Sequence, residues 1–177
     1  MKKLTSILIL CITIYSCSDY KQNEKVNNEL NLLRTELDSL KKLNTVENQI
    51  ATFLTFQKEN AEQAMNFYVE LFDNSKIINI KRWGKDGPGK EGTIMHATFN
   101  LNGKLFMCSD SPAIHDWDFT PAVSNYVECV STKQLEHFFT KLSDNGKVMM
   151  PLGNYGFSQK FGFVVDQFGV SWQLNLQ

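Results

Sequence analysis

Residues 61–76 read AEQAMNFYVELFDNSK, and residues 132–147 read TKQLEHFFTKLSDNGK. The second segment repeats the first without a gap, and the apolar positions that the two share lie at helical spacing. The identical positions are Gln63/Gln134, Phe67/Phe138, Leu71/Leu142, Asp73/Asp144, Asn74/Asn145 and Lys76/Lys147. An amphipathic helix followed by a turn and a strand is therefore predicted twice. In the first helix the apolar face is formed by Ala64, Phe67, Tyr68, Leu71 and Phe72.

Strand patterns surround each helix in the same order. Around the first helix, which Asn60 is expected to cap, alternating apolar segments predict strands at 50–56, 76–83, 93–101 and 104–110. Asn102-Gly103 predicts a two-residue hairpin turn, and Gly169 is its counterpart in the repeat. The sequence thus predicts an α+β fold of two tandem β-α-β-β-β modules, at about 50–110 and about 122–177, with a linker at 111–121.

The first 17 residues, MKKLTSILILCITIYSC, do not belong to this domain. Two lysines precede an apolar run that is shorter than the roughly 20 residues a bilayer core requires. The run ends in Ile-Tyr-Ser-Cys and resembles a bacterial lipoprotein signal. This resemblance predicts that residues 1–16 are removed, that Cys17 is acylated, and that the protein is anchored in the cell envelope. The alternative is an ordinary secretory signal with a chance cysteine.

Residues 17–47 are predicted to form a tether and a short helical stalk. Apolar residues recur there at alternating spacings of four and three, namely at Val26, Leu30, Leu33, Leu37 and Leu40. So short a stripe is marginal alone, and it predicts either a weakly self-associating stalk or a helix that docks on the domain. We favour a helical spacer between the membrane and the domain at 48–177.

Composition excludes one class of partner. The 177 residues carry a formal net charge of −1 without a basic stripe, so no nucleic-acid partner is expected.

Cys108 and Cys129 lie in apolar, strand-like surroundings. Buried free thiols are therefore favoured over a bridge between them.

Several motifs carry a resemblance to a known family. They are AEQAMNFYVELF, KDGPGKEGTIMHATFNLNGKLFMCSD, FTPAVSNYVEC and VMMPLGNYGFSQKFGFVVDQFGVSWQLNL. Together with the paired modules, they resemble the PhnB-like branch of the vicinal oxygen chelate superfamily over residues 50–177. The resemblance implies two curled mixed sheets with a central cleft. Members of this branch are often labelled as ubiquinone-pathway methyltransferases, but the chain has no strand followed by a G-x-G loop that opens a helix, because its glycine-rich loop at 84–92 leads into another predicted strand.

In metal-using members of the superfamily, His or Glu ligands occupy the first and last strands of the modules. Those places fall at or near Phe53, Met107, Ser124 and Gln173. Phenylalanine and methionine side chains do not bind a hard divalent ion, and serine and glutamine are weak neutral donors. We therefore predict no metal and no cofactor.

Other candidate ligands and nucleophiles do not form a recognisable site. The three histidines, His96, His115 and His137, lack the mutual spacing of a metal motif. Asp110, Asp116 and Asp118 form an acidic group near the linker, but loop aspartates are usually solvated or capping residues. No G-x-S-x-G elbow is present, and Cys108 has no neighbouring base.

The remaining feature is a largely apolar cleft with a few polar groups. Its expected walls are Phe53, Thr55, Met107, Ser124, Tyr126 and Gln173, with Trp83 and Tyr155 at the rim. The resulting hypothesis is a membrane-tethered module that binds or sequesters an unknown small molecule, as a homodimer by analogy. The alternatives are an enzyme, either metal-independent or with an unrecognised metal site, that acts on a small oxygenated metabolite, and an adaptor that works through its stalk.

Overall fold

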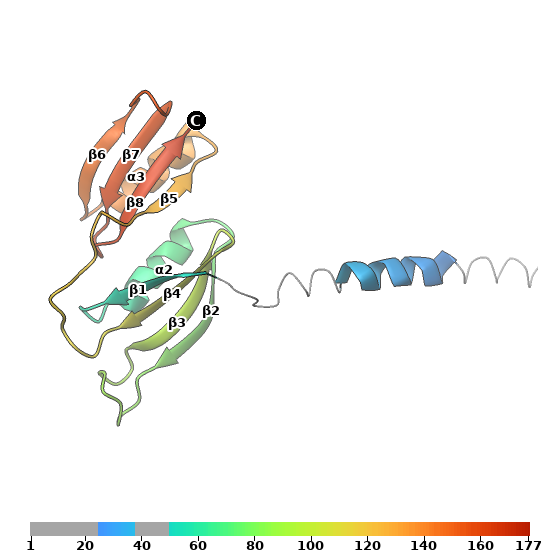
Figure 1. Ribbon diagram of the computed structural model, residues 1–177, viewed down its shortest axis with the longest axis horizontal. Coiled ribbons are helices and arrows are strands. Elements are labelled where there is room, and N and C mark those ends of the chain that lie inside the picture. Colours follow the sequence, from blue (N-terminus) through green and yellow to red (C-terminus); the bar gives the residue numbers. More distant parts are fainter. Residues whose placement is uncertain (1–24, 38–49) are drawn as a thin grey trace, which may run out of the picture. The chain divides into compact units, whose positions relative to one another are not determined.

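The computed structural model describes residues 25–37 and 50–177. Residues 25–37 form a helix on which Val26, Leu30, Leu33 and Leu37 are exposed, and residues 50–177 form a separate compact unit (Figure 1). Leu40, the signal segment and Cys17 lie outside the described residues. Among the helices that are described, none is long and apolar enough to span a bilayer.

The first module begins with strand β1 (Thr52–Phe56) and helix α2 (Ala61–Leu71). Strands β2 (Lys76–Arg82), β3 (Ile94–Leu101) and β4 (Lys104–Asp110) follow. The sheet order is β1-β4-β3-β2, in which β1 is parallel to β4 and the other pairs are antiparallel. One face of this mixed sheet packs against α2 (Figure 1).

The second module repeats this topology. It contains β5 (Asn125–Glu128), α3 (Thr132–Ser143), β6 (Lys147–Gly153), β7 (Lys160–Val165) and β8 (Ser171–Leu176). The sheet order is β5-β8-β7-β6, with β5 parallel to β8. The predicted pair of β-α-β-β-β modules is therefore confirmed.

The repeated turns also have the same backbone conformation. Asn74 and Asn145 follow the two helices with φ angles of 52° and 53°, in the left-handed region that asparagine tolerates. The hairpin turn has positive φ angles at both Asn102 (46°) and Gly103 (87°), as a type I′ turn requires. The similarity between the two segments thus extends to backbone geometry.

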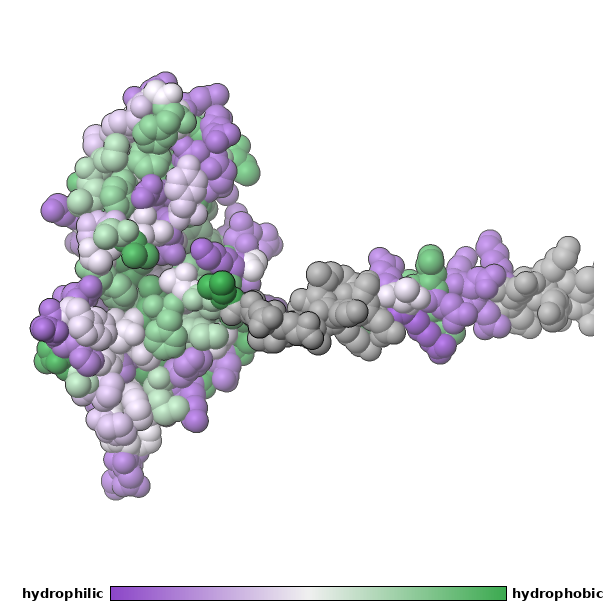
Figure 2. All heavy atoms as spheres, in the orientation of Figure 1, coloured by the Kyte–Doolittle hydropathy of each residue, from purple (hydrophilic) through white to green (hydrophobic). Residues whose placement is uncertain are grey.

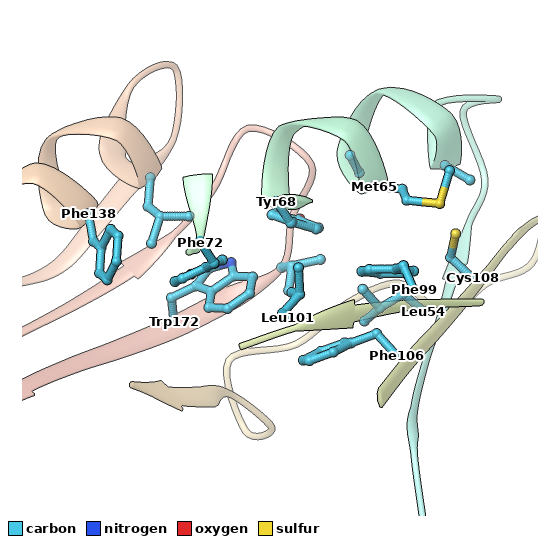
Figure 3. Close-up of a cluster of buried hydrophobic side chains, with 14 of the residues drawn as sticks. Leu54, Met65, Tyr68, Phe72, Phe99, Leu101, Phe106, Cys108, Phe138 and Trp172 are labelled. Carbon is cyan, nitrogen blue, oxygen red and sulfur yellow. The ribbon is translucent and has the colours of Figure 1, made fainter. Parts of the chain in front are cut away.

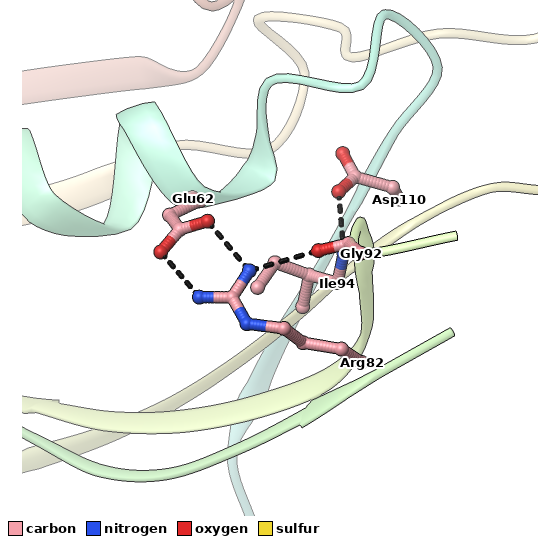
Figure 4. Close-up of polar contacts among 5 residues, drawn as sticks. All are labelled: Glu62, Arg82, Gly92, Ile94 and Asp110. Carbon is pink, nitrogen blue, oxygen red and sulfur yellow. Dashed lines mark hydrogen bonds and ion pairs between the residues drawn. The ribbon is translucent and has the colours of Figure 1, made fainter. Parts of the chain in front are cut away.

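The cap of α2 differs from expectation. Asn60 occupies the N-cap position but makes no side-chain cap bond. The carboxylate of Asp110 takes that role, because its Oδ1 accepts the Ala61 N–H at 2.9 Å and its Oδ2 accepts the Ile94 N–H at 2.8 Å (Figure 4). Asp110 is therefore a buried structural residue that joins the end of β4 to the start of α2.

The glycine-rich loop between β2 and β3 packs on Trp83. A Cβ atom at Gly89 would lie 2.4 Å from the indole ring, so only glycine permits this approach. Next to the loop, Arg82 makes a bidentate contact with Glu62 and donates to the Gly92 carbonyl (Figure 4). The loop forms a hydrophilic tip of the module (Figure 2). The interpretation of residues 84–92 as a turn-rich loop is confirmed.

A continuous apolar core runs through both modules. Figure 3 shows Phe72 from the end of α2 beside Trp172 of β8, with Phe138 of α3 next to them. The Phe72 ring centroid lies 5.1 Å from that of Trp172 and 4.9 Å from that of Phe138. The predicted apolar face of α2 is confirmed in the main, although Phe67 and Leu71 are only partly buried. Met65, which the prediction omitted, is fully buried.

One buried carboxylate connects the modules. Asp166, in the turn between β7 and β8, accepts hydrogen bonds from the Tyr68 hydroxyl at 2.7 Å and from the Trp172 indole N–H at 2.8 Å. Its other oxygen accepts the backbone N–H groups of Phe168 and Val170. Burial raises the pKa of Asp166, while these donors act in the opposite direction. Tyr68 belongs to the first module, so this bond fixes α2 against the second sheet.

We expect Tyr68→Phe to lower the free energy of unfolding by about 1–3 kcal/mol, because it removes a donor from a buried carboxylate without removing the ring. Urea denaturation followed by circular dichroism measures this loss. Tyr155→Phe is the matched control, since its exposed hydroxyl donates to the Pro151 carbonyl. Equal losses in the two variants would contradict a special role for the Tyr68–Asp166 bond.

Candidate functional site

Each sheet has a face that its helix does not cover, and the predicted site residues lie on these two faces. In the first sheet Phe53 is the register partner of Met107, and in the second Tyr126 is the partner of Gln173. Phe53 and Tyr126 are exposed, whereas Met107 and Gln173 are half-buried. The six residues thus form two groups, one on each sheet.

Two of the four positions at which the family resemblance led us to look for metal ligands are bonded to each other. The side-chain amide of Gln173 donates to the Ser124 hydroxyl at 2.6 Å. In the first sheet, the other two of these positions are Phe53 and Met107, which are register partners on neighbouring strands. They place an aromatic ring beside a thioether. None of these four side chains offers a carboxylate or an imidazole.

Three of the predicted residues meet in a pocket under the linker. This linker pocket has a volume of about 340 Å³ and includes Phe53, Thr55 and Ser124. The rest of its wall is Thr52, Leu54, Lys104, Trp117, Asp118, Phe119, Thr120, Val123, Asn125, Val170 and Ser171. Tyr126 instead lines a second pocket, and Met107 and Gln173 line neither. Neither Trp83 nor Tyr155 lines the linker pocket. Trp83 instead lies under the glycine-rich loop.

The linker pocket contains a buried polar atom without a partner. Ser171 is 2% exposed, and its hydroxyl has no hydrogen-bond partner among residues 25–37 and 50–177. An unpaired buried hydroxyl costs free energy, and a ligand that hydrogen-bonds to it recovers that cost. Because the Ser171 oxygen itself is almost inaccessible, the polar contacts open to a small molecule in this pocket are those of the more exposed Thr55, Ser124 and Lys104.

The linker is held in place by Gln57, which follows β1. The Gln57 amide donates to the Trp117 carbonyl, and its oxygen accepts the His115 N–H at 2.5 Å. The His115 ring stacks on the Trp117 ring with centroids 4.4 Å apart. These contacts position the linker wall of the pocket. Sequence analysis did not identify Gln57, because its partners lie about 60 residues away.

The histidines and acidic residues do not converge. His115 stacks on Trp117, His96 lies near the Phe53 ring with centroids 5.7 Å apart, and His137 contacts Phe138. Asp118 accepts the neighbouring Phe119 N–H, and Asp110 is buried under α2. Within residues 25–37 and 50–177, no group of three His, Cys, Asp or Glu side chains is placed to hold a metal ion.

The two cysteines of the domain are buried and free. Burial, with a smaller contribution from Asp110, raises the pKa of the Cys108 thiol to about 12. Burial raises the pKa of the Cys129 thiol to about 11, with a smaller contribution from the nearby charge of Glu128. Both thiols stay protonated near neutral pH, so neither has the thiolate character of a nucleophile.

Comparison with known proteins agrees with this architecture. The family model described as 3-demethylubiquinone-9 3-methyltransferase matches residues 48–175. A PhnB protein from Bacillus cereus is 53% identical and has a TM-score of 0.71, covering 73% of this chain and 100% of that chain. Protein PA1353 from Pseudomonas aeruginosa is 28% identical with a TM-score of 0.64, covering 74% and 98%. No protein of curated function matches the sequence.

We expect the untagged protein, purified from metal-replete medium, to retain less than about one tenth of a transition-metal ion per chain, because neutral donors hold such ions weakly. Inductively coupled plasma mass spectrometry measures this content. Added Mn²⁺, Ni²⁺ or Zn²⁺ should not raise the melting temperature. About one ion per chain, lost in Gln173→Ala or Ser124→Ala, would contradict this prediction and restore a metalloenzyme.

Proposed function

The chain belongs to the family described as 3-demethylubiquinone-9 3-methyltransferase, and from its linker pocket we propose that it binds or sequesters a small molecule without a metal ion. The observation that carries this proposal is a cavity of about 340 Å³ in which apolar walls, among them Phe53 and Phe119, surround a few polar groups such as Thr55 and Ser124. Cavities of this size accommodate small metabolites and drug-like molecules. The ligand class is therefore a compact, mainly apolar molecule with one hydrogen-bonding group.

The family's description as a methyltransferase finds no support in the strand-to-helix connections. An adenosyl cofactor is commonly held by glycines that follow a strand and open a helix. Here β1 leads into α2 through Gln57-Lys58-Glu59-Asn60, and β5 leads into α3 through Cys129-Val130-Ser131. Neither connection contains a glycine. The binding proposal therefore rests on the pocket and not on the family's description.

One observation favours the alternative of an enzyme. Glu128 lies on β5 on the same sheet face as Tyr126, and it accepts the Asn175 side-chain amide at 2.8 Å. Burial and the charge of Glu128 raise the pKa of the Tyr126 hydroxyl. A carboxylate beside a phenol is a usable acid–base pair, provided that a substrate reaches this face. Glu128 is not part of the linker pocket, so the two functions involve different residues.

A second copy of the chain is part of the proposal. Phe53 and Tyr126 leave large aromatic surfaces exposed on the uncovered sheet faces. Strands β1 and β5 each pair on one side only within the unit, so their other edges are free to hydrogen-bond. A homodimer that covers these faces and edges would bury the exposed rings and enclose the cleft.

To test binding, we would screen a library of small oxygenated and apolar molecules by ligand-observed NMR. Hits should lose at least about tenfold in affinity in Phe53→Ala, and less in Ser171→Ala, because the ring supplies the larger contact area. Tyr155→Phe, outside the pocket, is the control and should bind normally. Hits that are unaffected by Phe53→Ala and Ser171→Ala would contradict the assignment of this pocket.

In analytical ultracentrifugation the same protein should sediment as a dimer. Sedimentation as a monomer would refute the second copy.

The final part of the proposal is a tether to the envelope through acylated Cys17. It is supported by the apolar segment that ends at Cys17 and by the leucine-bearing helix at 25–37, which separates that cysteine from the domain. A helix with exposed leucines is suited to weak self-association.

Cys17→Ser should move the protein from the membrane fraction to the soluble fraction of expressing bacteria, because the lipid supplies the membrane affinity. Immunoblotting of the fractions and labelling with a palmitate analogue measure the change. Cys108→Ser is the matched control and should leave the distribution unaltered. Unchanged membrane association of Cys17→Ser would contradict the tether.

A further inference from the structure

A second pocket lies between the two modules. This inter-module pocket has a volume of about 280 Å³. It is bounded by the end of α2, the β3–β4 hairpin, β5 and α3. The residues that define its character are Phe72, Asp73, Lys104, Glu128, Phe138 and Trp172.

Aromatic rings form the floor of the inter-module pocket. Phe72 lies between Trp172 and Phe138 in the core cluster (Figure 3). Phe106 also lines the pocket, and the Lys104 ammonium already stands 5.8 Å from the centroid of its ring. Aromatic faces attract cations through their quadrupoles, most strongly where water is excluded. The floor is thus suited to an apolar body that carries positive charge.

The electrostatics of the rim also favour a cation. Asp73 follows directly after Phe72, the C-cap residue of α2. The C-terminal end of a helix carries partial negative charge, and the last turn of α2 contains no basic residue to neutralise it. Glu128 adds a second carboxylate, whereas Lys104 is the single basic residue of the lining. Neither Asp73 nor Lys104 takes part in an ion pair within the described residues.

We propose that the inter-module pocket binds a small organic cation, an amine or quaternary ammonium compound with an apolar body. The apolar body lies on the rings of Phe72, Phe138 and Trp172, and the charge lies toward Asp73 and the end of α2. This site is separate from the linker pocket. The two pockets share Lys104 and Asn125 but no aromatic residue.

The test uses phenethylamine as the probe, with 2-phenylethanol and 3-phenylpropionate as neutral and anionic analogues of the same shape. Isothermal titration calorimetry of the purified protein should rank phenethylamine first and 3-phenylpropionate last. Asp73→Asn should weaken phenethylamine binding about two- to fivefold, and Lys104→Gln should strengthen it by a similar factor, since each changes one charge near the site. Both residues are exposed, so these variants preserve the fold.

The sequence repeat supplies a matched control. Asp144 stands at the end of α3 as Asp73 stands at the end of α2, but it does not line the pocket. Asp144→Asn should therefore leave phenethylamine affinity unchanged. A Trp83→Phe, Trp117→Phe variant retains Trp172 as its single tryptophan, and phenethylamine should change its fluorescence.

Three results with the probes and the Lys104 variant would overturn the proposal, and a fourth comes from Phe53→Ala. They are equal affinity for 3-phenylpropionate and phenethylamine, weaker phenethylamine binding in Lys104→Gln, and no heat of binding at millimolar phenethylamine. Phe53→Ala separates this site from the proposed function, because it alters the linker pocket alone. Loss of phenethylamine binding in Phe53→Ala would place the cation in the linker pocket and refute a second site.

Discussion

The arrangement of the two modules depends on the carboxylate of Asp166. Four donors converge on it, from the Tyr68 hydroxyl, the Trp172 indole and two backbone amides. The raised pKa of Asp166 means that burial outweighs these donors, so ionisation of the group works against folding. Its favourable contribution is full below the unfolded pKa and is lost as the pH rises through the folded pKa. The network is therefore better understood as a device for orientation than as a source of net stability.

This orientation has consequences for both pockets. Because Trp172 donates to Asp166, its indole is held beside Phe72 at an interplanar angle of 31° and lines the inter-module pocket. The same turn leads into Val170 and Ser171, which line the linker pocket. One buried turn thus sets the floor of one cavity and a wall of the other. A change in the position of α2 would be transmitted to both.

Local patterns in the sequence predicted the fold well because each module is built from neighbouring segments. The helices, the Asn102-Gly103 turn and the order of elements along the chain follow from short-range periodicity and turn chemistry, whereas the parallel pairing of β1 with β4 joins distant segments. The cap of α2 was missed because its carboxylate comes from Asp110, 49 residues away. The same limit applies to the site. The family resemblance singled out Phe53 and Met107, which the structure pairs, whereas the wall made by Trp117 depends on Gln57, a long-range contact without a local pattern.

The two pockets are not electrostatically independent, because Lys104 and Asn125 line both of them. An ammonium in the inter-module pocket repels Lys104, whose side chain is long and exposed enough to turn toward the linker pocket. There it would face Asp118 and the unpaired hydroxyl of Ser171. Occupation of the inter-module pocket by a cation would therefore bring a hydrogen-bond donor into the linker pocket and favour a ligand whose polar group is an acceptor. Because such coupling is reciprocal, a ligand in the linker pocket that draws Lys104 toward it would in turn strengthen cation binding between the modules.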